Sequence, residues 1–238
     1  MEYRRLGVSG VRVSEIGLGS WLTYGVGVEA ERAKEIVARA YDLGVNFFDT
    51  ANAYGRGAAE RVLGEALAGY PRDSYVLATK VFYPMGDGPN DGGLSRKHVL
   101  EQCDASLRRL ATDYIDLYQC HRYDDETPLD ETLPALDDLV RRGKVLYVGV
   151  SEWTADQIAA ALHIADELGL DRVVAAEAGL SIAQLALAWV LREPNVASAI
   201  VGATRPEQIE ENCAAAGRTL DDDVLTAVDK AVGEVLDR

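Results

Sequence analysis

The chain has 238 residues, of which 48% are hydrophobic, and its formal net charge is −15 at pH 7. This apolar share is enough for one sizeable core, and no apolar run reaches the roughly 20 residues that a membrane helix needs. The negative charge argues against nucleic acid and against an anionic membrane as partners. The N-terminus shows no apolar leader, so we expect a cytoplasmic protein with a single domain over residues 1–238.

The three cysteines, Cys103, Cys120 and Cys213, are scattered along the chain and show no metal-binding spacing. We therefore expect buried thiols, with neither disulfide bridges nor a metal site.

The first half of the chain alternates short apolar runs with helical patterns. Residues 3–14 alternate around a Gly/Ser turn, which predicts a hairpin. Strands are predicted at residues 15–21, 43–48 and 75–79, and helices at 30–43 and 57–67. A loop rich in glycine, proline and aspartate at 84–93 leads to a helix that Ser95 caps and that ends at Leu110.

The second half continues the same alternation. Strands are predicted at residues 114–119, 144–150, 171–174 and 199–202. Helices are predicted at 129–142, from the Thr154 capping box to 168, at 182–191, from Pro206 onward, and at 220–235. A repeated strand-then-helix order predicts parallel strands joined by right-handed crossovers, and hence an α/β fold.

Four polar side chains follow successive strands of this pattern: Asp49, Tyr54, Lys80 and His121. In a parallel barrel the carboxyl ends of all strands surround one mouth, so these side chains should meet there. A tyrosine titrates near pH ~10, and a lysine ammonium close by lowers that value. An aspartate beside the lysine would hold it charged, and a histidine could orient a carbonyl group. The set therefore predicts proton transfer to a substrate.

Each of these residues also has an ordinary structural explanation. Asp49 could cap a helix, Lys80 could be its surface partner, and His121 could be a satisfied loop histidine. All four at successive strand ends are much harder to explain in this way. His98 and His163 lie inside helical patterns, and we interpret both as structural.

Several stretches resemble the aldo-keto reductases, in particular the branch that includes bacterial general reductases and potassium-channel β subunits. They are residues 47–55 (FFDTANAYG), 78–80 (ATK), 114–122 (YIDLYQCHR), 148–151 (VGVS) and 200–212 (IVGATRPEQIEEN). The resemblance covers nearly the whole chain.

The resemblance implies a (β/α)8 TIM barrel with an N-terminal hairpin that reduces aldehydes or ketones with NADPH. Tyr54 would donate the proton, Lys80 would tune it, Asp49 would hold Lys80, and His121 would position the substrate. Trp21, Tyr54 and His121 would contact the substrate. The residues implied for binding NADPH or NADP+ are Gly19, Ser20, Trp21, Asp49, Ser151, Gly202, Ala203, Arg205, Gln208, Glu211 and Asn212. Relatives often carry arginine or asparagine at the place of Glu152, which leaves its role open.

One stretch departs from the family pattern. After Val174 the chain runs within a few residues into 177–181, where relatives continue through a helix, another strand and a cofactor-clasping loop. A βα unit takes roughly 30 residues, and the deficit amounts to more than two such lengths. Either the protein lacks the stretch or these 238 residues omit it. If the loss is real, the strand-7 region is missing and the barrel has at most seven strands.

Two functions from different classes remain open. The first is an NADPH-dependent reductase of a small carbonyl substrate, acting as a monomer or weak homo-oligomer, and the intact set of four residues favours it. The second is a catalytically weak or inactive relative that senses nucleotide or binds a partner, and the short middle favours that one. A barrel isomerase or aldolase with Lys80 as a Schiff-base lysine is a distant third, because it leaves Tyr54 and the Arg205 region unexplained.

Overall fold

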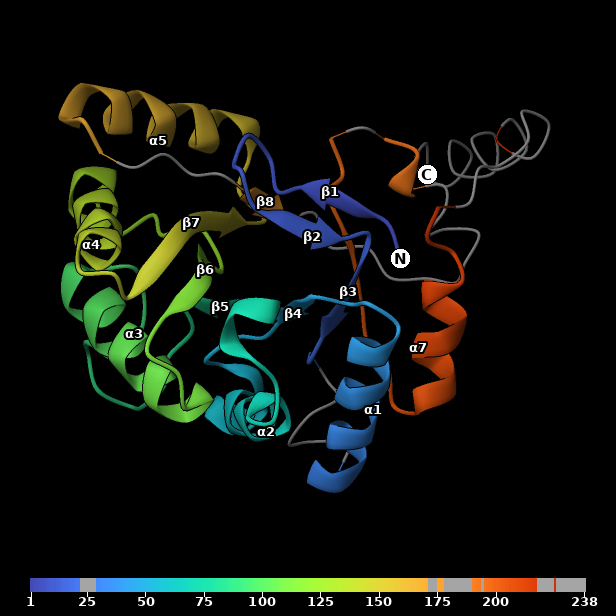
Figure 1. Cartoon of the computed structure of the whole chain (residues 1–238). Coiled ribbons are helices and arrows are strands. Elements are labelled where there is room, and N and C mark those ends of the chain that lie inside the picture. Colours follow the sequence, from blue (N-terminus) through green and yellow to red (C-terminus); the bar gives the residue numbers. More distant parts are fainter. Residues whose placement is uncertain (22–28, 171–174, 178–189, 194, 218–224, 226–238) are drawn as a thin grey trace, which may run out of the picture.

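The computed structural model describes residues 1–21, 29–170, 175–177, 190–193, 195–217 and 225. Within these residues the main sheet has seven strands in the order β8-β7-β6-β5-β4-β3-β9, and every neighbouring pair in it is parallel. Helices cover the outside of this curved sheet (Figure 1). The predicted α/β barrel is confirmed, and within the described residues it is incomplete in its strand-7 region.

The strands are β3 (Ile16–Gly19), β4 (Phe47–Asp49), β5 (Val76–Val81), β6 (Ile115–Cys120), β7 (Val145–Ser151), β8 (Ala175–Glu177) and β9 (Ala199–Val201). The helices are α1 (Ala30–Asp42), α2 (Ala58–Leu67), α3 (Arg96–Leu110), α4 (Leu129–Arg141), α5 (Ala155–Leu168) and α7 (Pro206–Cys213). Short 3-10 turns, η1 (Tyr54–Gly57) and η2 (Arg72–Ser74), flank α2. The predicted Ser95 cap and Thr154–Gln157 capping box both form.

The predicted hairpin forms between β1 (Tyr3–Arg5) and β2 (Arg12–Ser14), which pair antiparallel. Its apolar residues Leu6 and Val13 pack with Phe47 and Val76, which begin β4 and β5, and with Leu117 of β6. The hairpin therefore closes the amino-terminal end of the barrel and leaves the opposite end for the polar strand ends.

The two faces of each strand serve different parts of the core, as the period of two requires. Phe48, Leu77 and Tyr118 point outward and pack in the large cluster beneath the helices. Their neighbours Phe47 and Ala78 point into the barrel. Because side chains alternate, the residues that continue the inward rows toward the carboxyl ends are Asp49, Lys80, Gln119, His121 and Ser151.

The strand order shows which part of a complete barrel is absent from the described ranges. β9 pairs with β3, the first barrel strand, and therefore occupies the place of strand eight. β8 pairs with β7 and occupies the place of strand six. Within the described residues neither β8 nor β9 has a neighbour on its other side. The strand predicted at 171–174 lies outside those residues, as do the helix at 220–235 except residue 225 and most of the helix at 182–191.

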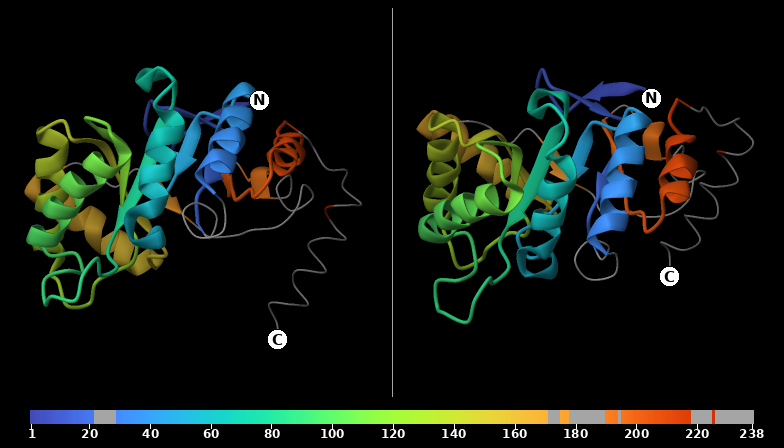
Figure 2. Two further views of the ribbon diagram at one scale, coloured as in Figure 1. Left: turned by 90° about the horizontal axis from the view of Figure 1, so that it is seen from below. Right: turned by 60° about the horizontal axis from the view of Figure 1, so that its bottom comes forward.

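Other contacts join the ends of the chain to the barrel. Arg39 of α1 forms a 2.6 Å ion pair with Glu210 of α7, and Figure 2 shows these two helices side by side. Within the described portion, no helix combines the length and apolarity that crossing a membrane would take.

A close contact between α2 and α3 gives a test of the packing. A Cβ added at Gly64 would lie 2.5 Å from the carbonyl oxygen of Leu110, which is backbone and cannot turn away. Overpacking of this kind costs about 1–3 kcal/mol, which opposes the roughly 1 kcal/mol that alanine gains over glycine in a helix. We expect Gly64→Ala to lower the urea midpoint. Gly69→Ala is the matched control, because its added Cβ meets nothing within 4 Å. Equal midpoints for the two variants would contradict this packing.

Candidate active site

The four predicted catalytic residues come from three neighbouring strands and one loop. Asp49 ends β4, Lys80 lies near the end of β5, and His121 directly follows β6. Tyr54 begins η1, the turn between β4 and α2. Since β4, β5 and β6 are neighbours in the sheet (Figure 1), their carboxyl ends bring the four residues to one end of the barrel.

A buried ion pair forms the base of the site. The Lys80 ammonium donates to Asp49 Oδ1 and, at 3.3 Å, to the carbonyl oxygen of Thr50. Both charged side chains are almost wholly buried, with Lys80 1% and Asp49 3% exposed. Gln119 donates from Nε2 to the second oxygen of Asp49 at 3.4 Å. These contacts offset the desolvation of two charges and fix the lysine in place.

The Tyr54 and Tyr83 rings both contact the His121 ring, and Tyr54 lies next to the ion pair. The Lys80 Nζ atom lies 5.5 Å from the centroid of the Tyr54 ring. The His121 ring meets the Tyr54 ring edge to face, with centroids 5.5 Å apart, and meets the Tyr83 ring at 5.0 Å on another side. The structure therefore brings together Asp49, Tyr54, Lys80 and His121, as the sequence predicted.

Gln119 and Tyr83 are two members of the site that the sequence analysis missed. Gln119 lies two residues before His121, so it shares the inward face of β6, and this spacing could have identified it. Tyr83 follows β5 just beyond Lys80, where a strand-end aromatic could also have been noted.

His121 is neutral in this setting. Burial, then the nearby charges of Lys80 and Arg122, lower its pKa from 6.5 to about 3. Its Nδ1 atom is buried and has no hydrogen-bond partner among the described residues. A neutral imidazole can offer a hydrogen bond to a carbonyl oxygen without carrying the proton that is transferred.

This electrostatic setting predicts how His121 titrates. A histidine whose folded pKa lies below its unfolded value remains neutral in the folded protein while the unfolded chain takes up a proton. The stability that His121 contributes is thus fully present above about pH 6.5 and declines as pH falls toward 3. We expect the His121 Cε1 proton resonance to show no inflection between pH 5 and 8 by NMR, with His121→Asn used for assignment. An inflection near pH 6.5 would contradict the buried, cation-flanked position.

The turn that carries Tyr54 has an unusual backbone. Gly55, Arg56 and Gly57 have φ angles of 56°, 51° and 83°, all in the left-handed region. The Arg109 side chain of α3 lies against Gly57 so closely that an added Cβ would be 2.5 Å from its Cδ atom. Glycine adopts this region freely, so the strain lies at Arg56, and such strain persists only where the surroundings determine it and clusters at functional sites.

A buried carboxylate ties this turn to the strand of Lys80. Glu60 of α2 is fully buried, and its Oε1 accepts a 2.7 Å hydrogen bond from the Thr79 hydroxyl. Its Oε2 accepts from Arg109 Nε at 2.5 Å. Thr79 precedes Lys80, so one carboxylate links the helix after Tyr54, the strand of Lys80 and helix α3. No sequence pattern indicated this role, because Glu60 lies in an ordinary helical pattern.

The residues implied for the nicotinamide end lie around the same mouth. The Ser20 hydroxyl donates to Thr50 Oγ1 at 2.8 Å, and the Ser20 amide donates to the Asp49 carbonyl oxygen. Gly19 ends β3 and Ser151 ends β7, and both are buried. Trp21 follows β3 with 64% of its surface exposed.

The residues implied for the adenosine end form a separate group after β9. Ala203 is buried, whereas the Arg205 side chain is exposed at the N-cap of α7. Gln208 already has partners, because its Oε1 accepts from the Thr204 amide at 2.7 Å and from the Arg205 amide at 3.3 Å. The other members of the group are Gly202, Glu211 and Asn212. β9 borders β3, so this group and the Gly19–Trp21 stretch follow adjacent strands.

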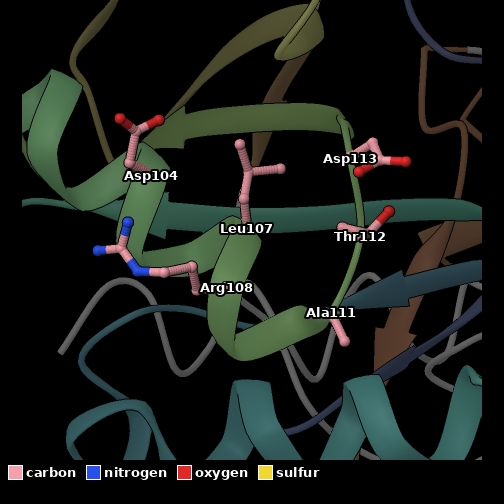
Figure 3. A pocket seen from close by; sticks show the side chains of 6 residues that line it. All are labelled: Asp104, Leu107, Arg108, Ala111, Thr112 and Asp113. Atoms are coloured by element: carbon pink, nitrogen blue, oxygen red, sulfur yellow. The ribbon is translucent and has the colours of Figure 1, made fainter.

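Two further features lie outside this site. An open hollow of about 430 Å³ is lined by Asp104, Leu107, Arg108, Ala111, Thr112 and Asp113 (Figure 3). It lies where α3 ends and leads into β6, and thus at the amino-terminal end of that strand, away from His121. Cys103 and Cys120 are buried free thiols whose pKa values burial raises to about 12, and Cys213 is a partly buried free thiol. Within the described ranges, no group of three or more His, Cys, Asp or Glu side chains could hold a metal.

Comparison with known proteins defines the class. A model of the Aldo/keto reductase family matches residues 15–173 and 166–232, and the chain belongs to this family. The chain is 34% identical to a protein of Arabidopsis thaliana named "Probable voltage-gated potassium channel subunit beta", over 89% of this chain and 90% of that protein. A protein of the same name from Oryza sativa subsp. japonica is 33% identical over the same shares. A relative from Schizosaccharomyces pombe with a similar name is 33% identical over 98% of this chain and 91% of its own length. Membership places the chain among oxidoreductases.

The same alignments give the number of aligned positions that have no counterpart in this chain. The Arabidopsis alignment spans 296 positions, while 89% of 238 residues is about 212, so about 84 positions have no counterpart in this chain. The Schizosaccharomyces alignment spans 321 positions against about 233 residues of this chain, which leaves about 88. The two family-model matches overlap at residues 166–173, just before β8. The expected deficit of more than two βα lengths is therefore confirmed.

Proposed function

We propose that the protein is an NADPH-dependent reductase that converts aldehydes or ketones to alcohols. The observation that carries this proposal is the buried Asp49–Lys80 pair beneath the Tyr54 ring, with the neutral His121 ring against it. In this proposal NADPH, when bound, supplies the hydride that the carbonyl carbon accepts.

Each protein residue then has one task. Tyr54 gives its phenolic proton to the carbonyl oxygen as that oxygen gains charge. The Lys80 ammonium favours the phenolate that remains, because a cation near a phenol stabilises its ionised form. Asp49 keeps Lys80 charged and fixed. His121 donates a hydrogen bond to the carbonyl oxygen and so places it near Tyr54.

The side chains present suit NADPH at its reacting end and in part at its other end. His121, whose buried Nδ1 has no hydrogen-bond partner among the described residues, and the strand-end Ser151 offer polar contacts where the nicotinamide and substrate would lie. The exposed Arg205 guanidinium suits a phosphate. The Thr204 and Arg205 amides, however, already donate to Gln208, so the phosphate would rely on the Arg205 side chain. In the proposed complex Gly202, Ala203, Gln208, Glu211 and Asn212 surround the adenosine.

Removing the Tyr54 hydroxyl tests the chemistry. General acid–base groups contribute roughly 10²–10⁴-fold in rate. We expect Tyr54→Phe to lose at least 100-fold in kcat for 4-nitrobenzaldehyde, while NADPH affinity, measured by fluorescence titration, changes little. Tyr70→Phe is the matched control, because Tyr70 packs against Tyr41 away from the site. A Tyr54→Phe protein that reduces the aldehyde at the parent rate would exclude Tyr54 as the acid.

Cofactor choice tests the adenosine end. A guanidinium binds a phosphate through two parallel hydrogen bonds, so Arg205 should favour the 2′-phosphate of NADPH. We expect the parent protein to bind NADPH more tightly than NADH and Arg205→Ala to reduce this ratio by about tenfold, the equivalent of 1.4 kcal/mol. The NADH affinity of the same variant serves as the internal control. Equal affinities of the parent protein for the two nucleotides would refute the assignment.

A second function is favoured by two specific observations. Relatives carry the name of a channel subunit, and about 84 aligned positions are missing from this chain. The alternative proposal is therefore a catalytically weak or inactive protein that senses nucleotide or binds a protein partner. NADPH binding without turnover of any aldehyde by the parent protein would favour it over the reductase. For the reductase we propose a small-molecule carbonyl substrate, a cytoplasmic location, and a monomer or weak homo-oligomer.

A further inference from the structure

The loops after β6 and β7 continue the pairing of the two strands. The last paired residues of the ladder are Cys120 and Val150. Two positions further, Arg122 forms a 2.9 Å ion pair with Glu152. One position beyond that, the Tyr123 and Trp153 rings meet edge to face with centroids 4.9 Å apart. Two successive contacts therefore hold the loops that carry Arg122 and Glu152 against each other.

Arg122 lies beside the reacting groups. Its Nη1 donates to the carbonyl oxygen of His121 at 2.8 Å. Its guanidinium carbon lies 5.7 Å from the centroid of the Tyr83 ring, which in turn contacts the His121 ring. The effect of its charge on the His121 pKa, smaller than those of burial and of Lys80, is consistent with this proximity.

The guanidinium keeps donors for a ligand. Its contacts with His121 and Glu152 both use Nη1, and within the described part of the chain no hydrogen bond from its Nε or Nη2 is seen. The side chain is 33% exposed, so a ligand at the mouth could reach it. A planar guanidinium edge of this kind matches a carboxylate or phosphate.

Glu152 has an unusual backbone for its position. Its φ angle is 55°, in the left-handed region that a residue with a side chain rarely adopts, and its side chain is 52% exposed. An exposed ion pair contributes little to stability. Glu152 therefore has a strained backbone conformation although its ion pair adds little to the stability of the fold. This combination points to a role at the mouth.

We propose that Arg122 recognises an anionic group on the carbonyl substrate, and that Glu152 holds the guanidinium in place while weakening its attraction for that anion. The substrate class is an aldehyde or ketone with a carboxylate or phosphate remote from the reacting carbonyl. The ion pair thus sets the preference between anionic and neutral carbonyls. This inference rests on the proposed reductase function.

The test compares two aldehydes of similar shape, 4-carboxybenzaldehyde and 4-nitrobenzaldehyde, at saturating NADPH. The measured quantity is the ratio of their kcat/KM values. A hydrogen bond to a charged group contributes about 1.5–3 kcal/mol, so Arg122→Met should lower the carboxy-to-nitro ratio by about tenfold or more. Glu152→Gln should raise the same ratio by a few fold, because the guanidinium loses its counter-charge. Both effects should shrink at 1 M salt.

Arg142→Met is the matched control. Arg142 is an exposed arginine at the end of α4 with an aspartate partner, Asp138, 3.9 Å away. This variant changes the net charge as Arg122→Met does, so a ratio that moves equally in both would reflect long-range charge and overturn the proposal. A ratio within twofold of the parent value in Arg122→Met would also overturn it, as would a lower ratio in Glu152→Gln.

Binding separates this inference from the reductase function. If the parent protein reduces neither aldehyde, the proposed function fails, and calorimetric titration with the two aldehydes in the presence of NADPH still measures the preference. Weaker binding of 4-carboxybenzaldehyde to Arg122→Met than to the parent would then support the role of Arg122. Equal binding would overturn it.

Discussion

The buried ion pair between Lys80 and Asp49 is the constraint on which the site depends. Two charges that are almost fully removed from water stay together only if every lone pair and proton finds a partner. The Thr50 carbonyl oxygen and the Gln119 amide supply two of these partners. Thr50 directly follows β4, and the register of β5 with β6 pairs Gln119 with Lys80. The hairpin fills the opposite end of the barrel with apolar side chains. The position of Lys80, and hence of the cation near Tyr54, is therefore a product of the whole barrel.

The Tyr54 turn shows how this constraint reaches the loops. Gly55 and Gly57 adopt the left-handed region freely, but Arg56 between them does so at a cost that its surroundings must offset. Here Arg109 packs on Gly57, and Glu60 links Arg109 to Thr79, the neighbour of Lys80. Removing one partner from such a buried network costs about 3–5 kcal/mol, because the other charge is left uncompensated. The same contacts that stabilise α2 and α3 against the sheet thus set the distance between the tyrosine and the lysine.

The sequence predicted the strand-end residues because period and order determine them. Asp49, Lys80 and His121 each lie at the end of a short, mainly apolar strand, and these three strands are neighbours. Parallel strands bring such ends together whatever the details of side-chain packing. Glu60 could not be found in this way. Its burial arises from Arg109, 49 residues further along the chain, and no local pattern records that contact. The strand predicted at 171–174 lies outside the described residues, and the described strand β8 begins at Ala175.

The stretch of the family pattern that this chain lacks concerns one side of the barrel mouth, between β8 and β9. In a complete barrel the unit between β8 and β9 would add a strand and a loop on the cofactor side, and about 84 aligned positions of a relative have no counterpart here. The reacting side of the mouth, built from β4 to β7, keeps its full set of neighbours. The positive charges on this side act on the protonation of His121. Lys80 and Arg122 both disfavour a proton on His121, which leaves the imidazole as a neutral donor of a hydrogen bond. The Tyr54 ring contacts the His121 ring and has its centroid 5.5 Å from the Lys80 Nζ atom, and the proposed proton transfer from Tyr54 depends on this arrangement.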